Sequence, residues 1–320
     1  MENNIFTGLK KNLPGVQKNI LLAPHTTFCI GGPAKYFFIA REKKSLIKAI
    51  TVAKKLHMPV FVLGGGSNLL VSDKGFTGLV VKIQLAKWRF EPNNAIVSDA
   101  GVMMQSLVGA SVKNGMAGLE WAGGLPGTLG GAIRGNAGAF GGEMKDSILQ
   151  VGALENHLNY KTLSNKQCQF SYRSSIFKEK NLPVISAKIQ LKKGDKKNLQ
   201  AIANSHIEYR KEKHPLEYPN AGSVFKNVDV KRLSSKFQKL FSDKVKKDPF
   251  EIVPSAWFII GAGLSGKTIG QAQISEKHSN YIINLGGAKA KDVLSLIAFA
   301  RKAVKKKYGI DLEQEIQYLD

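Results

Sequence analysis

A glycine-dense segment, residues 118–142, constrains this chain more than any other feature. The run GLEWAGGLPGTLGGAIRGNAGAFGG holds ten glycines in 25 residues, far above the ~7 per cent that is average for proteins. A second cluster, GGGSNLL at residues 64–70, lies between two apolar runs that are typical of strands. Glycine lets backbone N–H groups approach a ligand closely, and successive N–H groups form anion-binding nests. Two dense clusters in one half of the chain therefore favour a long polyphosphate ligand over a set of tight turns.

A third glycine run, GAGLSGKT at residues 261–268, matches two motifs at once. One is the phosphate-cradling P-loop and the other is the dinucleotide-binding fingerprint. The preceding apolar run, residues 257–260, is compatible with a strand. However, a P-loop domain needs a later strand that ends in Asp, and NYIINLGG provides none. A dinucleotide fold needs an acidic residue about 20 positions on, where this chain has Gly286 and Gly287. We therefore expect the double match to be a coincidence.

The hydrophobic pattern predicts an α+β chain with many short strands rather than regular βαβ alternation. Helical spacing of apolar residues predicts helices at residues 44–56, 103–115, 196–214 and about 289–307, and residues 315–319 read as a terminal strand. The third of these helices ends at a proline and is expected to connect two domains. We assign residues 1–195, with a core at about 30–195, to the first domain and residues 196–320 to the second.

Among the composition values of the chain, the formal net charge of +23 is the unusual one. Clustered Lys and Arg would indicate nucleic-acid binding, but the lysines are scattered and no aromatic base-stacking pattern accompanies them, so we expect no nucleic-acid partner. Two cysteines and six histidines show no metal-ligand spacing, so we expect no metal site. No apolar run approaches the ~18 residues that span a bilayer, and the start shows no export signal. These features predict a cytoplasmic protein without a membrane partner.

Seven motifs follow one another along the chain: HTTFCIGGPA, GGGSNLL, GLEWAGGLPGTLGGAIRGNAGAFGGEM, YRSSIF, PLEYPNAGSVFKN, GQAQISEKHSNYIIN and LEQEI. In this order they resemble the UDP-N-acetylenolpyruvoylglucosamine reductases, the MurB-type flavoenzymes of peptidoglycan synthesis. The resemblance covers about residue 20 to the C-terminus. It implies an FAD-binding fold of the vanillyl-alcohol-oxidase (PCMH) type in residues 1–195 plus a smaller α+β substrate-binding domain in residues 196–320. The compact run PLEYPNAGSVFKN is similar to the shorter type of the family, which lacks a tyrosine-bearing loop.

The resemblance implies a reaction in two halves. NADPH reduces bound FAD, and the hydride then passes from FAD N5 to the vinyl carbon of UDP-N-acetyl-3-O-(1-carboxyvinyl)-glucosamine, which gives UDP-N-acetylmuramate. By resemblance, Ser223 donates the proton to C2, whereas the residues alone favour a turn-capping serine. Arg173 matches the family's active-site arginine, whose guanidinium suits the carboxylate and its enolate. By the same resemblance, Glu315 matches the third catalytic position. Glu313 would share a strand face with Glu315, and the family's apolar pair after the catalytic residue favours Glu315.

The resemblance also assigns the binding residues. The FAD contacts it implies are Gly64, Gly65, Gly66, Ser67, Asn68, Gly124, Gly127, Thr128, Gly131, Asn136 and Gly138. The substrate contacts are Tyr172, Lys226 and Asn227, with Arg210, Lys211 and Lys213 as further candidates for the UDP diphosphate. We expect a monomer whose partners are the UDP-sugar and NADPH. Two alternatives stay open: an FAD-linked oxidase or dehydrogenase of another small molecule, and a basic nucleic-acid-binding protein. The NAGSVFKN and LEQEI motifs favour the reductase.

Overall fold

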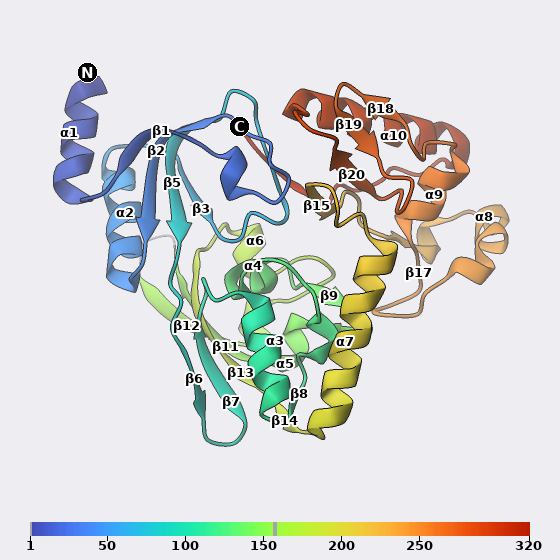
Figure 1. Cartoon of the computed structure of the whole chain (residues 1–320), viewed down its shortest axis with the longest axis horizontal. Coiled ribbons are helices and arrows are strands. Elements are labelled where there is room, and N and C mark those ends of the chain that lie inside the picture. Colours follow the sequence, from blue (N-terminus) through green and yellow to red (C-terminus); the bar gives the residue numbers. More distant parts are fainter. Residues whose placement is uncertain (1, 156–158) are drawn as a thin grey trace. The chain divides into compact units, whose positions relative to one another are not determined.

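The computed structural model of the chain describes residues 2–155 and 159–320 (Figure 1). The chain forms two compact units that interleave along the sequence. The first unit comprises Met1–Ile20, Ala34–Gly65 and Phe76–Glu208, and the second comprises Leu21–Pro33, Gly66–Gly75 and Tyr209–Asp320. The expected domain boundary, between residues 195 and 196, lies at the start of helix α7 (Lys196–Lys213), whereas the compact units change inside that helix. The assignment of cofactor and substrate to separate domains stays a prediction.

A four-stranded sheet forms one layer of the first unit, in the order β1–β2–β5–β3. Its strands are β1 (Gln17–Leu21), β2 (Pro33–Ala40), β3 (Val60–Leu63) and β5 (Phe76–Ile83). β2 and β3 both pair with β5 in parallel. Helices α1 (Glu2–Asn12) and α2 (Lys43–Lys55) lie beside this sheet (Figure 1). α2 buries Leu46, Ala49, Ile50 and Ala53 against the sheet, a spacing of three and four residues that places them on one helical face.

A five-stranded antiparallel sheet, in the order β12–β11–β13–β7–β6, forms the other part of the first unit. Its strands are β6 (Trp88–Glu91), β7 (Ala95–Asp99), β11 (Ile148–Leu154), β12 (Tyr160–Ser164) and β13 (Val184–Gln190). Its core also includes side chains of α3 (Met104–Lys113), α4 (Leu129–Arg134), α5 (Met144–Ser147) and α6 (Ile176–Glu179). The glycine-dense segment runs through this layer, with the short strands β8 (Met116–Ala117), β9 (Gly138–Ala139) and β10 (Gly142–Glu143).

The second unit is built on a four-stranded antiparallel sheet in the order β15–β20–β19–β18. Its strands are β15 (Asn220–Ser223), β18 (Thr268–Ile269), β19 (Ala272–Ile274) and β20 (Tyr281–Asn284). Helices α9 (Ser255–Gly261) and α10 (Ala290–Tyr308) share its core (Figure 1). The unit also contains β16 (Val228–Asp229), β17 (Ile252–Val253), α8 (Ser235–Leu240) and the parallel pair β4 (Leu69–Val71) and β21 (Gln317–Leu319).

Helix α10 shows how a segment from the first half of the chain becomes part of the second unit. The Asp73 carboxylate accepts hydrogen bonds from the backbone N–H groups of Ala290 (2.8 Å) and Lys291 (3.1 Å). These donors have no partner within the helix, so the carboxylate satisfies them and interacts favourably with the helix dipole. The helix ends at Gly309, whose φ of +73° is the left-handed conformation that glycine adopts readily.

The apolar run at residues 257–260, which is compatible with a strand by sequence, lies in helix α9. Ser255, Phe258 and Ile259 are buried while Trp257 and Ile260 are exposed, and this period of three to four residues is that of a helix. The GAGLSGKT run also continues into strand β18 rather than into a helix, with Gly263 and Gly266 at φ of +72° and +77°. A P-loop delivers its phosphate to the start of a helix. The run is therefore a turn before a β-hairpin, as expected from the coincidental match.

Candidate functional site

The two glycine clusters meet within the first unit, where Gly64 and Gly65 lie against Gly127 and Thr128. A Cβ atom on Gly64 would lie 2.8 Å from Thr128 Oγ1, and one on Gly65 would lie 2.7 Å from Gly127 Cα. Backbone cannot move aside as a flexible side chain can, so only glycine fits at position 65. Thr128 begins α4 and its hydroxyl accepts a hydrogen bond from the Gly131 N–H at 3.5 Å. The structure thus brings together residues that lie more than 60 positions apart in the sequence.

Gly131 differs from these two glycines. Its backbone is helical and exposed, and a Cβ there would find only Thr128 Oγ1, at an ordinary 3.7 Å. Protein packing alone therefore does not require glycine at this position. Close approach of a ligand to the backbone is one physical reason that would favour glycine here.

Lys82 of β5 supplies a cation beside Gly64, a position that the sequence alone does not reveal. Its Nζ atom donates a hydrogen bond to the Gly64 carbonyl at 2.6 Å. Burial lowers the pKa of Lys82. The one available signal was a lysine that interrupts an apolar, buried strand, FTGLVVKI. Buried lysines need a polar partner, so this residue was a candidate for a functional or positioning role.

Asn136 is fully buried and its side chain is engaged by the protein itself. Its amide donates to Glu143 Oε2 (2.5 Å) and to the Ser171 carbonyl (3.1 Å), and its Oδ1 accepts from the Lys145 N–H (3.0 Å). A satisfied buried amide of this kind fixes the backbone around it. It ties the glycine-dense segment to the chain next to Tyr172 and the expected catalytic arginine.

Arg173 lies against the glycine-dense segment. Its Nη2 atom donates to the Gly138 carbonyl at 2.9 Å, and the guanidinium carbon is 5.1 Å from the centre of the Tyr172 ring. Its φ of +56° is unusual for a residue with a side chain. Such conformations persist where the surroundings enforce them, often at functional sites. Gly124 and Gly127, at φ of +71° and +94°, give the same segment its turns.

These residues fit an anionic cofactor. The two glycine clusters meet mainly through backbone atoms, and Gly131 has room beside it. Two cations lie at these clusters: Lys82 donates to the Gly64 carbonyl and Arg173 to the Gly138 carbonyl. Backbone N–H groups with nearby cations are the ordinary donors to a diphosphate. In the first unit, the expected FAD residues 64–65 and 124–138 thus form one surface that FAD can use, and their individual contacts stay predictions.

In the second unit, Ser223 lies directly opposite Tyr281 in the β15–β20 pair. Residues directly opposite in an antiparallel pair point to the same face of the sheet. Tyr281 is 7% exposed, and burial raises the pKa of its phenol to about 12. The positive charge of Arg210 and a side-chain hydrogen bond with Ser223 act in the opposite direction, whereas the charge of Glu315 raises this pKa further. Ser223 and Glu315, two of the expected catalytic residues, and Arg210 therefore all act on the same phenol, that of Tyr281.

Glu315 is fixed through the backbone on both sides. Its N–H donates to the Val224 carbonyl at 2.7 Å, and its carbonyl accepts from Asn68 Nδ2 at 3.3 Å. The Gln317 N–H donates to the Asn68 carbonyl at 3.0 Å. Gly66, Ser67 and Asn68 belong to the second unit. Five of the seven residues of the GGGSNLL cluster, residues 66–70, thus share a unit with Ser223 and Glu315.

Glu313 lies in a different environment from Glu315. Its carboxylate accepts from Arg232 Nη1 (2.7 Å) and from Lys226 Nζ (3.3 Å). The regular strand β21 begins only at Gln317, so both glutamates lie in the extended segment before it. Side-chain partners, rather than alternation on a strand, distinguish the two.

The other expected substrate contacts differ in burial. Asn227 Oδ1 accepts from the Ser255 N–H at 3.3 Å, which fixes its side chain beside α9. Among the three basic candidates, Arg210 is 9% exposed and its charge acts on Tyr281, whereas Lys213 pairs with Glu212 on the surface. The Lys211 carbonyl accepts from Lys277 Nζ at 2.9 Å. Arg210 is therefore the best placed of the three to act with Ser223.

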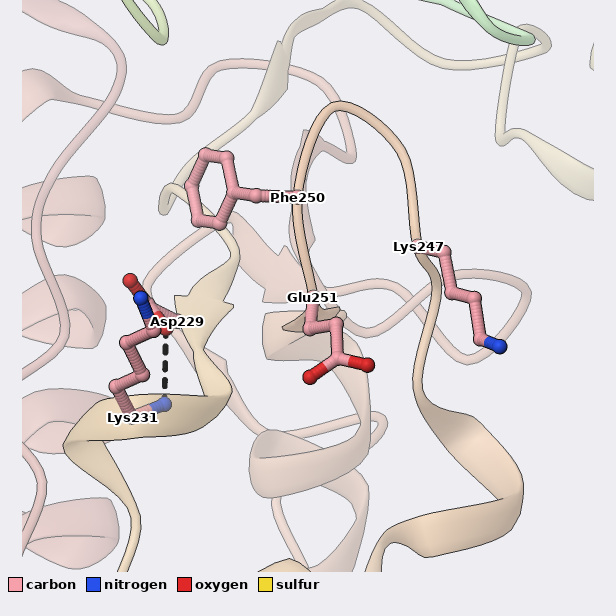
Figure 2. A pocket seen from close by; sticks show the side chains of 5 residues that line it. All are labelled: Asp229, Lys231, Lys247, Phe250 and Glu251. Atoms are coloured by element: carbon pink, nitrogen blue, oxygen red, sulfur yellow. Dashed lines mark hydrogen bonds between the residues drawn. The ribbon is translucent and has the colours of Figure 1, made fainter.

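A cavity of about 490 Å³ lies elsewhere in the second unit (Figure 2). Its lining residues are Asp229, Lys231, Lys247, Phe250 and Glu251. The Lys231 N–H donates to Asp229 Oδ1 at 2.8 Å. The lining includes both positively and negatively charged side chains. None of the expected site residues contributes to it.

The described residues show neither a cluster of metal ligands nor a membrane-spanning helix. Within residues 2–155 and 159–320, no three His, Cys, Asp or Glu side chains gather as they would around a metal ion. Across that same part of the chain, every helix is too short or too polar to cross a membrane.

The fold and the glycine loops define a class of protein, and comparisons with known proteins agree. Residues 34–156, which include both glycine clusters, match the family described as FAD binding domain. The chain is thus an FAD-binding protein with an additional C-terminal domain. Residues 214–319 match the family described as UDP-N-acetylenolpyruvoylglucosamine reductase, C-terminal domain.

The similarity extends over nearly the whole chain. UDP-N-acetylenolpyruvoylglucosamine reductases of Caldanaerobacter subterraneus subsp. tengcongensis and Caldicellulosiruptor bescii are each 39% identical to it, over 92% and 93% of this chain and 90% and 88% of theirs. The crystal structure of the reductase from Thermus caldophilus superimposes with a TM-score of 0.75 at 28% identity, covering 95% of this chain and 99% of that one. The chain belongs to the UDP-N-acetylenolpyruvoylglucosamine reductase family. The predicted family, fold class and FAD cofactor are confirmed.

Proposed function

We propose that this protein uses NADPH and bound FAD to reduce UDP-N-acetyl-3-O-(1-carboxyvinyl)-glucosamine to UDP-N-acetylmuramate. The observation that carries the proposal is the grouping of Ser223, Glu315 and Arg210 around Tyr281. This group lies in the second unit, which contains the whole match to the reductases' C-terminal domain, residues 214–319. We further propose a monomer that acts in the cytoplasm.

The chemistry divides between cofactor and protein. FAD, when bound, supplies the hydride chemistry that no side chain can provide. Hydride addition to the vinyl carbon leaves negative charge on C2 and on the neighbouring carboxylate. Arg173 carries a planar guanidinium that can bind such a carboxylate through two hydrogen bonds. Ser223 donates a proton to C2, which is reasonable for a weak acid because an enolate is a strong base.

The remaining residues bind and orient. Glu315, whose charge acts on Tyr281 and whose N–H donates to the Val224 carbonyl at 2.7 Å, helps to protonate or stabilise the enolate. Lys226, Asn227 and Arg210 bind the UDP diphosphate, since cations and amides are common phosphate partners. Lys226 exchanges its ion pair with Glu313 for the diphosphate when the substrate arrives. Tyr172 contacts the substrate beside Arg173.

The test separates the two half-reactions in a stopped-flow instrument. Ser223→Ala should be reduced by NADPH at nearly the normal rate, because that step takes no proton from Ser223. Reoxidation by the enolpyruvyl substrate should slow by at least about 10²–10⁴-fold, the usual loss when a general acid is removed. Equal slowing of both steps would show that Ser223 is structural and would refute the assignment.

A further inference from the structure

A chain of three polar side chains leads from Ser223 toward solvent. The phenol of Tyr281 interacts with the Ser223 hydroxyl on one side, across the β15–β20 pair. On the other side its oxygen lies 3.1 Å from His214 Nδ1. The imidazole is tilted 38° to the phenol ring, with 5.1 Å between the ring centres. His214 follows the end of helix α7 and is only partly buried, so its ring borders both the core and water.

The surroundings keep His214 neutral at physiological pH. Burial lowers its pKa to about 4, and the charges of His278, Arg210, Lys277 and Lys246 act in the same direction. A neutral imidazole carries one N–H and one lone pair. It can therefore release a proton from one nitrogen while it accepts another proton on the other.

We propose that Tyr281 and His214 form a proton relay that supplies Ser223 during reduction of the substrate. The inference rests on the proposed role of Ser223 as the acid. Tyr281 and His214 act through Ser223, so they are positioning residues rather than catalytic ones. In the competent arrangement His214 Nδ1–H donates to Tyr281 Oη, and the Tyr281 O–H donates to Ser223 Oγ.

This polarity has a direct consequence for catalysis. It leaves the Ser223 hydroxyl hydrogen free to point at C2, whereas the opposite polarity would direct that hydrogen at the phenol. It also stabilises the serine oxygen as the O–H bond breaks, because a second donor is already in place.

The protons balance along the chain. The Ser223 O–H bond breaks and a C–H bond forms at C2, while the Tyr281 proton moves to Ser223 Oγ. The His214 Nδ1 proton moves to Tyr281 Oη, and a solvent proton binds His214 Nε2. All three residues end neutral, with His214 as its other tautomer, and exchange of the half-buried ring with water restores the first tautomer. The net result is transfer of one solvent proton to C2.

Two variants test the relay in the FAD-loaded protein. Tyr281→Phe keeps the buried ring and removes the hydroxyl. His214→Gln keeps a hydrogen-bond donor for Tyr281 but cannot pass a proton through its side chain. Tyr308→Phe is the matched control, because Tyr308 is also 7% exposed and packs among Phe237, Phe241 and Phe258. Stopped-flow reoxidation by the UDP-sugar is measured in mixtures of H₂O and D₂O, with NADPH reduction and FAD content as checks.

In the wild type and Tyr308→Phe, the reoxidation rate should curve with the D₂O fraction, because several protons move together. Tyr281→Phe and His214→Gln should each slow reoxidation roughly tenfold or more, less than loss of the acid itself, and the dependence on D₂O should become linear. NADPH reduction should be unchanged in all variants. Wild-type reoxidation with the same curvature in either relay variant would overturn the relay. If Ser223→Ala is crippled in reoxidation while both relay variants are normal, only the relay fails. If Ser223→Ala reoxidises normally, the proposed acid itself is wrong.

Discussion

Replacement of Gly131 by alanine separates ligand binding from protein packing in the glycine-dense segment. Gly131 lies in helix α4, is exposed, and would place a new Cβ 3.7 Å from the nearest heavy atom, Thr128 Oγ1. The protein therefore accommodates the methyl group without strain. Because alanine is the better helix former, Gly131→Ala should leave the free energy of unfolding of the FAD-free protein unchanged or raise it by up to about 1 kcal/mol.

FAD affinity should respond in the opposite direction. If the cofactor approaches the backbone at Gly131, the methyl group overpacks that contact, at a cost of about 1–3 kcal/mol. This cost corresponds to FAD binding that is about fivefold to 150-fold weaker. The assay is titration of the FAD-free variant with FAD, followed by flavin fluorescence, alongside urea unfolding without FAD.

Two further glycines serve as controls. Gly109 of α3 is also exposed and helical, and a Cβ added there would meet no heavy atom within 4 Å, so Gly109→Ala should leave FAD affinity unchanged. Gly65→Ala should destabilise even the FAD-free protein, because its Cβ would lie 2.7 Å from Gly127 Cα. If Gly131→Ala binds FAD as tightly as the wild type, Gly131 is not part of the cofactor surface and the argument from the unexplained glycine is refuted.

Three other predictions follow from the same structure. Lys267→Ala should leave FAD content and turnover within a few-fold of the wild type, since its Nζ lies 5.2 Å from an aromatic ring centre in a hairpin turn; a P-loop-like loss of nucleotide binding would contradict this. Glu315→Gln should slow flavin reoxidation by substrate with normal FAD content, whereas Glu313→Gln should affect mainly KM for the UDP-sugar; the reverse result would mean that the two glutamates are misassigned. Because the pKa of His214 falls from about 6.5 unfolded to about 4 folded, the unfolded chain binds more protons between these values. Stability should therefore fall as pH drops from about 6.5 to about 4, and urea midpoints of His214→Gln should lose part of this slope.

The sequence predicted local features well where pattern and motif agree. The helices at α2, α3, α7 and α10 follow from apolar spacing and from the glycine or proline beyond their ends. The sequence left residues 257–260 ambiguous, because four consecutive large apolar residues fit a buried strand and a buried helix equally well. Only the packing of Phe258 and Ile259 inward, with Trp257 outward, shows the helical period.

The sequence could not predict partners that only tertiary structure brings together. Tyr281 lies within the GQAQISEKHSNYIIN motif, yet the neighbouring residues do not reveal that β20 places it opposite Ser223. The same holds for Lys82, which meets Gly64 from a different strand. Glu313 and Glu315 are two residues apart and chemically identical, so only Lys226 and Arg232 on one side and Tyr281 on the other distinguish them.

The interleaving of the chain has a mechanistic consequence for the GGGSNLL cluster. Gly64 and Gly65 pack in the first unit against the glycine-dense segment, but the chain from Gly66 to Gly75 belongs to the second unit. There the Asn68 backbone and side chain bond to the segment that carries Glu315, β4 pairs with β21, and Asp73 caps α10. The expected FAD residue Asn68 and the expected catalytic residue Glu315 are therefore held by the same hydrogen bonds. A change in the β4–β21 pair must disturb both, whereas a change at Gly131 reaches the cofactor surface of the first unit alone, which is why Gly131 is the informative position.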